Sequence, residues 1–369
     1  MQTKKKLIIF MPFIGGGGVE KNLFIISKFL ANKINDVIVC TTSKSEREKF
    51  SSRVKFLFTK KEFSKKTNIR IKYLYCLYVL FKFLKKNENT VVLSFQANIY
   101  CVIICKILGI KVIVRSNSSP SGWYHNNFKK FIYKKIISLA DKVVVNSLEF
   151  KKQMESRFNI KVDCIFNPLN KREIIKKSKL KSNEQFFKSK KKYLKILNIG
   201  RFTEQKDQIT ILKAAKILKK NLDFRLLIYG SGVEKKNLQK YIFENGLRNK
   251  VKLRNFIQNP YPIINQSDIF ILSSRYEGLP NVLLEAASLK KLIFSTDCPT
   301  GPKEILKNGK GGFLFKIGDH KELVKKINLY LKNKKRFNSK INFTYNQLDR
   351  YNLNKNLNKY FFLLKPYLV

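Results

Sequence analysis

Acidic residues and histidine are scarce in this chain of 369 residues. It has 25 Asp and Glu against 76 Lys and Arg, a formal net charge of +51, and only two histidines, His125 and His320. The six cysteines are scattered, without a CxxC motif or His-rich spacing. Neither a zinc site nor a disulfide framework is therefore predicted, and a reducing compartment fits the sequence best.

Long apolar runs are also missing. The two longest, residues 73–84 and 99–110, each contain a lysine and are shorter than the roughly 20 residues that span a bilayer. The basic and apolar N-terminus is interrupted by four glycines, Gly15 to Gly18, and no small-residue cleavage site follows it. We expect neither a transmembrane helix nor a signal peptide.

The excess of positive charge has two interpretations. A field of that size attracts nucleic acid, anionic lipid or a phosphorylated substrate. Alternatively, it reflects a bias toward Lys, Ile and Asn over the whole chain, because the lysines decorate nearly every predicted helix rather than form one tract. No zinc-finger, RNP or KH pattern occurs, so no specific nucleic acid is expected as a partner.

Short apolar runs alternate with segments of helical period along most of the chain. This alternation predicts an α/β fold with two Rossmann-like domains, each a doubly wound parallel sheet. Strands are predicted at residues 6–13, 36–42, 53–59, 90–95, 111–116, 142–146, 162–166, 193–199, 224–229, 251–256, 269–272 and 292–295. Helices are predicted at residues 19–31, 69–86, 99–108, 126–139, 148–158 and 208–219. The predicted domains are residues 1–168 and 193–349, and the charged segment 169–192 is predicted to be a linker with a short helix.

The stretch RYEGLPNVLLE, residues 275–285, is the centre of the functional prediction. It follows a buried strand and opens a helix with Pro280 in its first turn. The free N–H groups at such a helix N-terminus suit an anion such as a diphosphate. Glu277 and Glu285 frame that position, and ionised carboxylates accept hydrogen bonds from sugar hydroxyls. Taken singly, each is equally well interpreted as a solvated surface residue.

Other polar residues directly follow predicted strands of the second half. Ligands gather at the carboxyl ends of the strands in an open parallel sheet, so these side chains should share one rim. They are Arg201, Lys206, Gly230, Gly232, Glu277 and Glu285. Asp207 is predicted to cap the helix that follows Lys206. In the first half, Gly15 to Gly18 form a strand-to-helix turn, but without GxGxxG or a following acidic residue a dinucleotide site is disfavoured.

The chain resembles the retaining GT-B glycosyltransferases of family 4 over nearly its whole length. The motifs that carry the resemblance are GGGGVEK, NIGRFTEQKD, IYGSG, SSRYEGLPNVLLEAASLKKLIFSTD and GPKEIL. The resemblance implies a GT-B fold in which a C-terminal helix, about residues 350–369, returns to the first domain. It also implies transfer of a hexose or N-acetylhexosamine from a nucleotide sugar.

The resemblance assigns roles to the rim residues. Arg201 and Lys206 would bind the diphosphate, Glu285 the ribose hydroxyls and Glu277 the transferred sugar, while Gly17 and Gly18 would close over the phosphates. Further donor contacts are implied for Gly200, Gly230, Gly232, Gly278, Leu279, Asn281 and Val282. Transfer would retain the anomeric configuration. No cofactor and no metal are expected, and no Asp-x-Asp motif follows a predicted strand.

The acceptor side departs from the family pattern. Many relatives place a histidine at a strand end in the first domain, where this chain has Arg115, Ser116 and Asn117. Arg115, Asn117 and His125 are the acceptor-side candidates, each against a purely structural role.

The run Thr296 to Pro302, sequence TDCPTGP, resembles relatives that act on undecaprenyl-diphosphate-linked sugars. A free or lipid-linked glycan is therefore the expected acceptor. The basic and aromatic segment 60–86, with Lys129, Lys130, Lys134 and Lys135, suggests peripheral binding to the inner face of the cytoplasmic membrane. An ordinary buried helix with solvated lysines explains segment 60–86 equally well.

Two alternatives stay open at this stage. One is a non-catalytic basic protein that binds RNA or anionic polysaccharide, which explains the charge but leaves Glu277 and Glu285 without a purpose. The other is a GT-B phosphorylase, although the chain is short for that class and shows no pyridoxal-phosphate lysine context.

Overall fold

The computed structural model describes residues 5–59, 63, 67–117, 127–188 and 192–369. The chain divides into two compact units. Unit 1 comprises Met1–Pro168 together with Leu353–Val369, and unit 2 comprises Leu169–Asn352. The C-terminal segment thus belongs to the same unit as the N-terminus.

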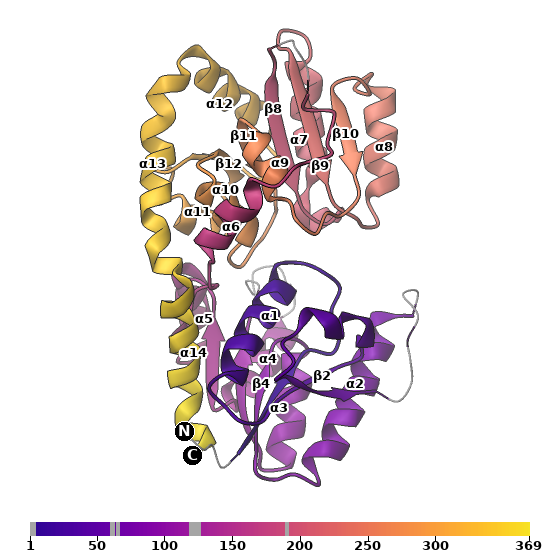
Figure 1. Ribbon diagram of the computed structural model, residues 1–369, viewed down its shortest axis with the longest axis vertical. Coiled ribbons are helices and arrows are strands. Elements are labelled where there is room, and N and C mark those ends of the chain that lie inside the picture. The colour runs from indigo at the N-terminus through magenta and orange to yellow at the C-terminus, as the bar shows by residue number, and fades with distance from the viewer. Residues whose placement is uncertain (1–4, 60–62, 64–66, 118–126, 189–191) are drawn as a thin grey trace. The chain divides into compact units, whose positions relative to one another are not determined.

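Unit 1 is built on a seven-stranded parallel sheet (Figure 1). In spatial order its strands are β3 (Lys55–Phe58), β2 (Val37–Thr41), β1 (Lys6–Phe10), β4 (Thr90–Ser94), β5 (Lys111–Arg115), β6 (Lys142–Val145) and β7 (Asp163–Cys164). Strands β2 and β4 are buried along their whole length, as expected for a parallel sheet with helices on both faces.

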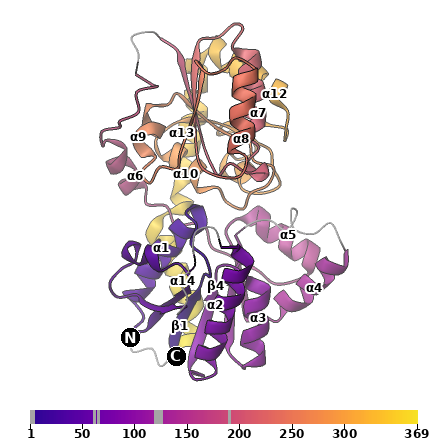
Figure 2. The same ribbon diagram turned by 90° about the vertical axis from the view of Figure 1, so that its right-hand side faces the viewer.

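Two groups of helices cover the unit 1 sheet. One face packs against α1 (Gly18–Ala31) and the C-terminal helix α14 (Leu353–Leu368). The other packs against α2 (Ile69–Leu84), α3 (Asn98–Ile107), α4 (Asn127–Ser138) and α5 (Leu148–Phe158), as Figure 2 shows. Local sequence fixes some of these helix starts, since Asn68 accepts a hydrogen bond from the Arg70 N–H and Ser147 accepts one from the Phe150 N–H. A short 3₁₀ helix, η1 (Lys44–Lys49), precedes β3.

Unit 2 contains a six-stranded parallel sheet. Its order is β10 (Val251–Arg254), β9 (Phe224–Tyr229), β8 (Leu194–Ile199), β11 (Ile269–Leu272), β12 (Leu292–Thr296) and β13 (Phe313–Phe315). Helices α7 (Gln208–Leu218), α8 (Lys235–Glu244) and α12 (His320–Lys332) share one hydrophobic core with the sheet. Helices α6 (Lys171–Ser178), α9 (Tyr261–Gln266), α10 (Asn281–Ser288) and α13 (Asn338–Asn346) pack against one another. The remaining helical pieces are η3 (Glu204–Lys206), α11 (Pro302–Ile305), η4 (Lys334–Phe337) and η5 (Gln347–Tyr351).

The predicted doubly wound architecture is confirmed, and the predicted strands lie within a few residues of the observed ones. The described part of residues 169–192, predicted to be a linker with a short helix, includes α6 and is grouped with unit 2. Pro280 occupies the N-cap of α10 rather than its first turn. Asp207 also stands at an N-cap, but its carboxylate accepts a bond from the Thr210 hydroxyl, 2.9 Å, instead of from a backbone N–H.

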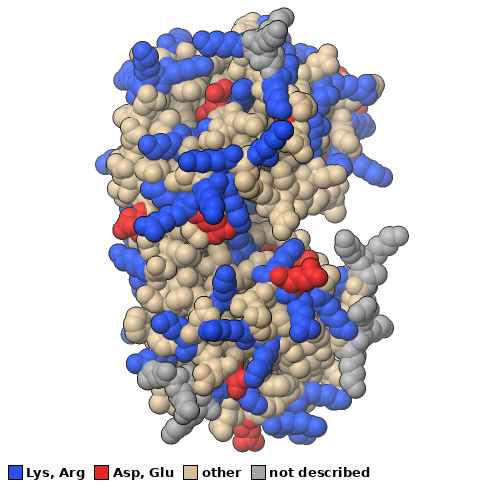
Figure 3. Space-filling view, viewed as in Figure 1, with Lys and Arg blue, Asp and Glu red and all other residues tan. Residues whose placement is uncertain are grey.

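Positive charge covers the surface broadly. Figure 3 shows Lys and Arg spread over the whole face in view, with few Asp and Glu among them. None of the described helices combines the length and the apolar character that crossing a bilayer requires.

Candidate active site

The strands at the centre of the unit 2 sheet end at the same level. Ile199 at the end of β8 pairs with Tyr229 at the end of β9, and Leu272 at the end of β11 pairs with Ser295 of β12. The loops that follow these strands therefore meet at one edge of the sheet, which we call the rim. The residues of unit 2 that the sequence analysis singled out lie on these loops or on the helices that continue them.

Lys206 and Glu277 form the central contact of the rim. The Lys206 ammonium lies 2.5 Å from Glu277 Oε1, across 71 residues of sequence. Both side chains are largely buried, with 16% of Lys206 and 8% of Glu277 exposed. The same carboxylate oxygen accepts a hydrogen bond of 2.6 Å from the Ser274 hydroxyl. Glu277 is thus a fixed carboxylate rather than a solvated turn residue.

Backbone and side-chain hydrogen bonds tie the Glu277 turn to the loop that precedes α7. The Ser273 hydroxyl donates to the Lys206 carbonyl, 2.7 Å, and the Gln205 amide donates to the Tyr276 carbonyl, 3.0 Å. The Arg275 N–H donates to the Gln205 carbonyl, 2.8 Å. Lys206 and Glu277 are therefore held by two loops that brace each other.

The end of β12 and the loop after it support the turn from its other side. The Thr300 hydroxyl donates to the Glu277 carbonyl, and the Thr296 hydroxyl donates to the Ser274 carbonyl at 2.6 Å. These supporting residues were missed from the sequence. Their only sequence signal is a hydroxyl within a few residues of a strand end, which is common in loops.

Close backbone approaches explain the glycines of the rim. A Cβ on Gly230 would lie 2.0 Å from the Gly200 carbonyl oxygen, and one on Gly232 would lie 2.3 Å from that of Phe202. Gly301 has a φ of +85°, and its Cβ would lie 2.1 Å from the Gly278 carbonyl oxygen. The loops after β8, β9, β11 and β12 therefore pack backbone against backbone, which is reason enough for glycine at these positions.

Glu285 lies one turn inside α10 and is buried, with 6% of its surface exposed. Gly278 and Leu279 before the helix are also buried, while Asn281 and Val282 in its first turn are half-buried. The first turn of α10 starts at the rim, where N–H groups of a helix lack intrahelical partners and favour negative charge. Two carboxylates thus flank a helix N-terminus, as the sequence predicted.

Arg201 is an exposed cation of the rim. It follows Gly200 at the end of β8, and its guanidinium lies 3.5 Å from the Gln205 side chain. Its carbonyl accepts a hydrogen bond of 3.0 Å from the Gln208 amide. The backbone at Arg201 is therefore fixed, while the side chain is open to an anion from solvent.

The pKa of the Cys298 thiol is affected by burial and by the charge of Glu277. Burial raises its pKa well above the ordinary range, and the negative charge of Glu277 raises it further. Cys298 therefore stays protonated and is a packing residue, not a nucleophile.

Unit 1 contains the acceptor-side candidates and also Gly17 and Gly18, the two glycines predicted to close over the donor phosphates. Gly17 caps α1 and Gly18 begins it, both exposed. Asn117 donates from its amide to the Phe95 carbonyl, 2.8 Å. Within the described part of the chain, three buried oxygens at the ends of β5 and β6 have no hydrogen-bond partner, namely Ser116 Oγ, Asn117 Oδ1 and Asn146 Oδ1. His125 lies outside the described residues.

Arg115 was an acceptor-side candidate in the sequence, against a purely structural role. Its side chain is wholly buried and stacks on Phe95, with the guanidinium 5.0 Å from the ring centre. Nε donates to the Tyr360 hydroxyl and Nη2 to Asn167 Oδ1, both at 2.7 Å. Arg115 therefore joins the β5 end to α14, while its Nη1 is buried without a hydrogen-bond partner. The two bonds made by Nε and Nη2 favour a positioning role.

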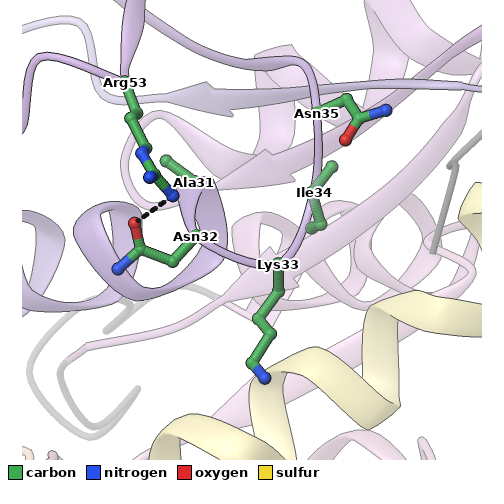
Figure 4. Close-up of a pocket in the computed structure, with 6 residues that line it drawn as sticks. All are labelled: Ala31, Asn32, Lys33, Ile34, Asn35 and Arg53. Atoms are coloured by element: carbon green, nitrogen blue, oxygen red, sulfur yellow. Dashed lines mark hydrogen bonds between the residues drawn. The ribbon is translucent and has the colours of Figure 1, made fainter.

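A hollow in unit 1 takes no part in this chemistry. Figure 4 shows its lining residues, Ala31, Asn32, Lys33, Ile34, Asn35 and Arg53, with a hydrogen bond of 3.2 Å from Arg53 to Asn32. The hollow lies between the end of α1 and the start of β2, and hence at the edge of the sheet opposite the strand ends. Over the described residues there is also no group of three or more His, Cys, Asp or Glu side chains placed to hold a metal.

Solved structures share this architecture over nearly the whole chain. A glycosyltransferase from Rickettsia africae matches with a TM-score of 0.76 and 20% identity, covering 99% of both chains. The Anabaena protein HepE, crystallised with UDP and glucose, matches with a TM-score of 0.80 and 15% identity, covering 98% of this chain and 100% of that one. The fold is that of the GT-B glycosyltransferases.

Sequence comparisons agree with the fold. Residues 181–347 match the family described as "Glycosyl transferases group 1". An uncharacterized glycosyltransferase of Methanocaldococcus jannaschii is 36% identical over 62% of this chain and 61% of its own length. A Campylobacter jejuni N-acetylgalactosaminyltransferase, named for its diphospho-undecaprenol-linked acceptor, is 26% identical over 90% of this chain and 91% of its own. At residues 181–347 the chain is therefore similar to the group 1 glycosyltransferases.

Proposed function

We propose that this glycosyltransferase transfers a hexose or N-acetylhexosamine from a UDP-linked donor to a polyprenyl-diphosphate-linked glycan. It would act with retention of configuration, without a metal, in bacterial surface-glycan assembly at the inner face of the cytoplasmic membrane. The observation that carries the proposal is the buried Lys206–Glu277 pair beside Glu285 and the exposed Arg201. Two cations and two fixed carboxylates on one rim suit a diphosphate with hydroxyl-rich groups at both ends.

The pairing of Lys206 does not prevent it from holding the donor. An ammonium has three N–H donors, so Lys206 can bind Glu277 and a phosphate oxygen together. Arg201 would hold the diphosphate from the solvent side, and Glu285 would accept hydrogen bonds from ribose. Glu277 would accept them from the transferred sugar, whose position next to Lys206 places its anomeric carbon beside the leaving phosphate.

The reaction would break the bond between the anomeric carbon and the diphosphate oxygen. The acceptor hydroxyl oxygen would bond to the same face of that carbon, and its proton would pass to the departing diphosphate. Charge accumulates on the diphosphate as it leaves, and cations fixed beforehand stabilise that charge without reorganising. Arg201 and Lys206 would supply this stabilisation.

Unit 1 would supply the acceptor site. The buried oxygens of Ser116, Asn117 and Asn146 carry unused hydrogen-bonding capacity at neighbouring strand ends. Sugar hydroxyls are suitable partners, because each both donates and accepts. The relatives named for undecaprenol-linked acceptors support a lipid-linked glycan at this place, and HepE with UDP supports a uridine donor.

Thermal-shift measurements with UDP, GDP and their sugars, with and without EDTA, test the donor site. Stabilisation by UDP that survives EDTA and disappears in Arg201→Ala is the expected result.

In Glu285→Gln, the donor KM should rise about 10-fold or more, since a hydrogen bond to a charged group contributes about 1.5–3 kcal/mol. Glu244→Gln on exposed α8 is the matched control. If no nucleotide changes the melting temperature while the protein still binds RNA or anionic polysaccharide, the chain is a basic binding protein and not an enzyme. The anomeric configuration of the product, determined by NMR, tests retention.

A further inference from the structure

Three neighbouring helices of unit 1 each turn an apolar stripe toward solvent. In α2 the exposed residues follow helical spacing at Ile71, Leu74, Tyr78 and Phe81, opposite a buried stripe that packs on the sheet. In α3 the exposed stripe is Tyr100, Ile103 and Ile107, and in α4 it is Phe128, Phe131 and Ile132. The three helices lie side by side, because α2 contacts α3 and α3 contacts α4 (Figure 2). We call their exposed apolar residues together the α2–α4 face.

This face differs from several other outer helices. Three of them carry Lys–Glu pairs one turn apart on their exposed sides, namely α6 with Lys177 and Glu173, α8 with Lys240 and Glu244, and α12 with Lys326 and Glu322. Such pairs are typical of helices that face water. The sequences of α2, α3 and α4 contain no Asp or Glu at all. A soluble monomer has no need of so extensive an apolar surface, which indicates a binding partner.

Cations accompany the apolar stripes. Arg70 and Lys82 are exposed on α2, and Lys129 and Lys135 are exposed on α4. Two of them lie over aromatic rings of the face, Lys82 at 4.8 Å from the ring centre of Tyr78 and Lys135 at 5.5 Å from that of Phe131. Asp141, just beyond α4, already binds Lys106 and Lys111 and does not offset these cations. The face is therefore both apolar and positive.

We propose that the α2–α4 face docks on an anionic phospholipid bilayer. Aliphatic and aromatic side chains would enter the boundary between headgroups and acyl chains, and the lysines and arginine would contact lipid phosphates. This inference rests on the proposed function, because it gives a surface to the membrane on which a lipid-linked acceptor would be met. It also brings in α3, which the sequence analysis did not connect with the membrane.

Charge and chemistry select this partner over others. A second copy docked through the same face would bring cations against cations with no carboxylate between them. RNA would satisfy the charges, but it presents little apolar surface to Ile71, Leu74 or Ile107. A bilayer of anionic lipid satisfies both features at once.

Vesicle sedimentation tests the surface directly. The probe is vesicles of phosphatidylethanolamine and phosphatidylglycerol, compared with neutral phosphatidylcholine vesicles. The test variant replaces Leu74, Ile107 and Phe128 by Ser, residues that are 67%, 73% and 69% exposed, so that every charge is kept. The matched control replaces Phe243, Leu329 and Phe362 by Ser, which are exposed on α8, α12 and α14. Thermal shift with UDP is measured for all three proteins.

The expected result is that wild type and control bind anionic vesicles, and bind neutral ones weakly. The test variant should bind anionic vesicles at least tenfold more weakly while keeping its UDP response. Equal vesicle binding by the test variant and wild type would overturn the proposal, since charge alone would then suffice. A wild-type dimer that the test variant converts to a monomer in light scattering would also overturn it. Failure of the proposed function would instead appear as no UDP response in wild type, whatever the vesicles show.

Discussion

The Lys206 ammonium and the Glu277 carboxylate meet at 2.5 Å, and the Ser274 hydroxyl completes the set with a 2.6 Å bond to the same carboxylate oxygen. Neither residue is near the other in sequence, and each comes from a loop that the other loop supports. The arrangement places a cation and an acceptor of hydrogen bonds side by side before any ligand arrives. Replacing each partner in turn should therefore have different effects.

Glu277→Gln should separate binding from transfer. The change removes a negative charge beside the proposed diphosphate position, so UDP should bind at least as tightly as in wild type. Transfer should fall about 100-fold or more, since the amide is a weaker acceptor for the sugar hydroxyls. Isothermal titration with UDP and initial rates with a donor sugar measure the two effects.

Lys206→Met should act in the opposite sense on binding. Loss of a charge-assisted hydrogen bond of about 1.5–3 kcal/mol weakens UDP binding about 10- to 100-fold. The variant leaves Glu277 with Ser274 as a partner, and its melting temperature is recorded to separate unfolding from lost affinity. If both variants lose UDP binding to the same extent, the pair is structural and the assignment of Lys206 to the diphosphate is wrong.

Gly301→Ala should disturb the Glu277 turn from behind. A methyl group there would lie 2.1 Å from the Gly278 carbonyl oxygen, at a φ of +85°. Gly318 has a similar φ of +77° but open space around its Cβ position, so Gly318→Ala isolates the backbone strain. We expect Gly318→Ala to cost about 1 kcal/mol, and Gly301→Ala to cost more than about 2 kcal/mol and to weaken UDP binding. Urea unfolding measures the loss of stability, and UDP titration measures the loss of affinity. Equal losses of stability in the two variants would show that the loops move apart freely.

The fold was accessible from the sequence because most strands are short, strongly apolar and separated by helix-period segments. Strand β13 escaped prediction, since its three residues, Phe313–Phe315, are too few to show a period. The sequence also did not show how the segment predicted as a linker, residues 169–192, packs. The charged side chains that suggested solvent exposure include Glu184, which is buried by contacts with Tyr229 and Arg254 far along the chain.

The rim residues were predictable because strand ends of a parallel sheet meet at one edge, which brings Lys206 to Glu277. The supporting groups were not, since nothing local marks Ser274 or Thr300 as partners of the turn. The sequence left Arg115 between an acceptor contact and a structural role, because its partner Tyr360 lies 245 residues later in the chain. The sequence located the end of β5, but only the packed structure shows which residues the Arg115 side chain contacts.

Tyr360→Phe should therefore destabilise unit 1. The change removes the hydroxyl that accepts from Arg115 Nε and leaves part of a buried guanidinium without a partner, which costs about 1–3 kcal/mol. Tyr367→Phe on the same helix is the control and should change stability by less than about 0.5 kcal/mol. Urea unfolding followed by circular dichroism gives the comparison. If Tyr360→Phe and Tyr367→Phe unfold at the same urea concentration, α14 does not depend on Arg115. The positioning role of Arg115 is then withdrawn.

Glu184 makes the stability of unit 2 depend on acid. Burial raises the pKa of its carboxyl group, but hydrogen bonds from Arg254 and Tyr229 outweigh that effect and lower the pKa to about 2. The carboxyl group of Glu in an unfolded chain has a pKa of about 4.3. Between the folded and the unfolded pKa, the folded chain therefore binds fewer protons than the unfolded chain. The stabilisation is complete above the unfolded pKa and is lost as the pH falls through the folded one.

We expect Glu184→Gln to cost about 2 kcal/mol near pH 6, less than the roughly 3–5 kcal/mol of a fully buried pair, because 39% of Arg254 is exposed. The difference from wild type in the free energy of unfolding should shrink toward about pH 3. Glu244→Gln, in an exposed pair, should show no such trend, and a difference for Glu184→Gln that stays constant with pH would contradict the assignment.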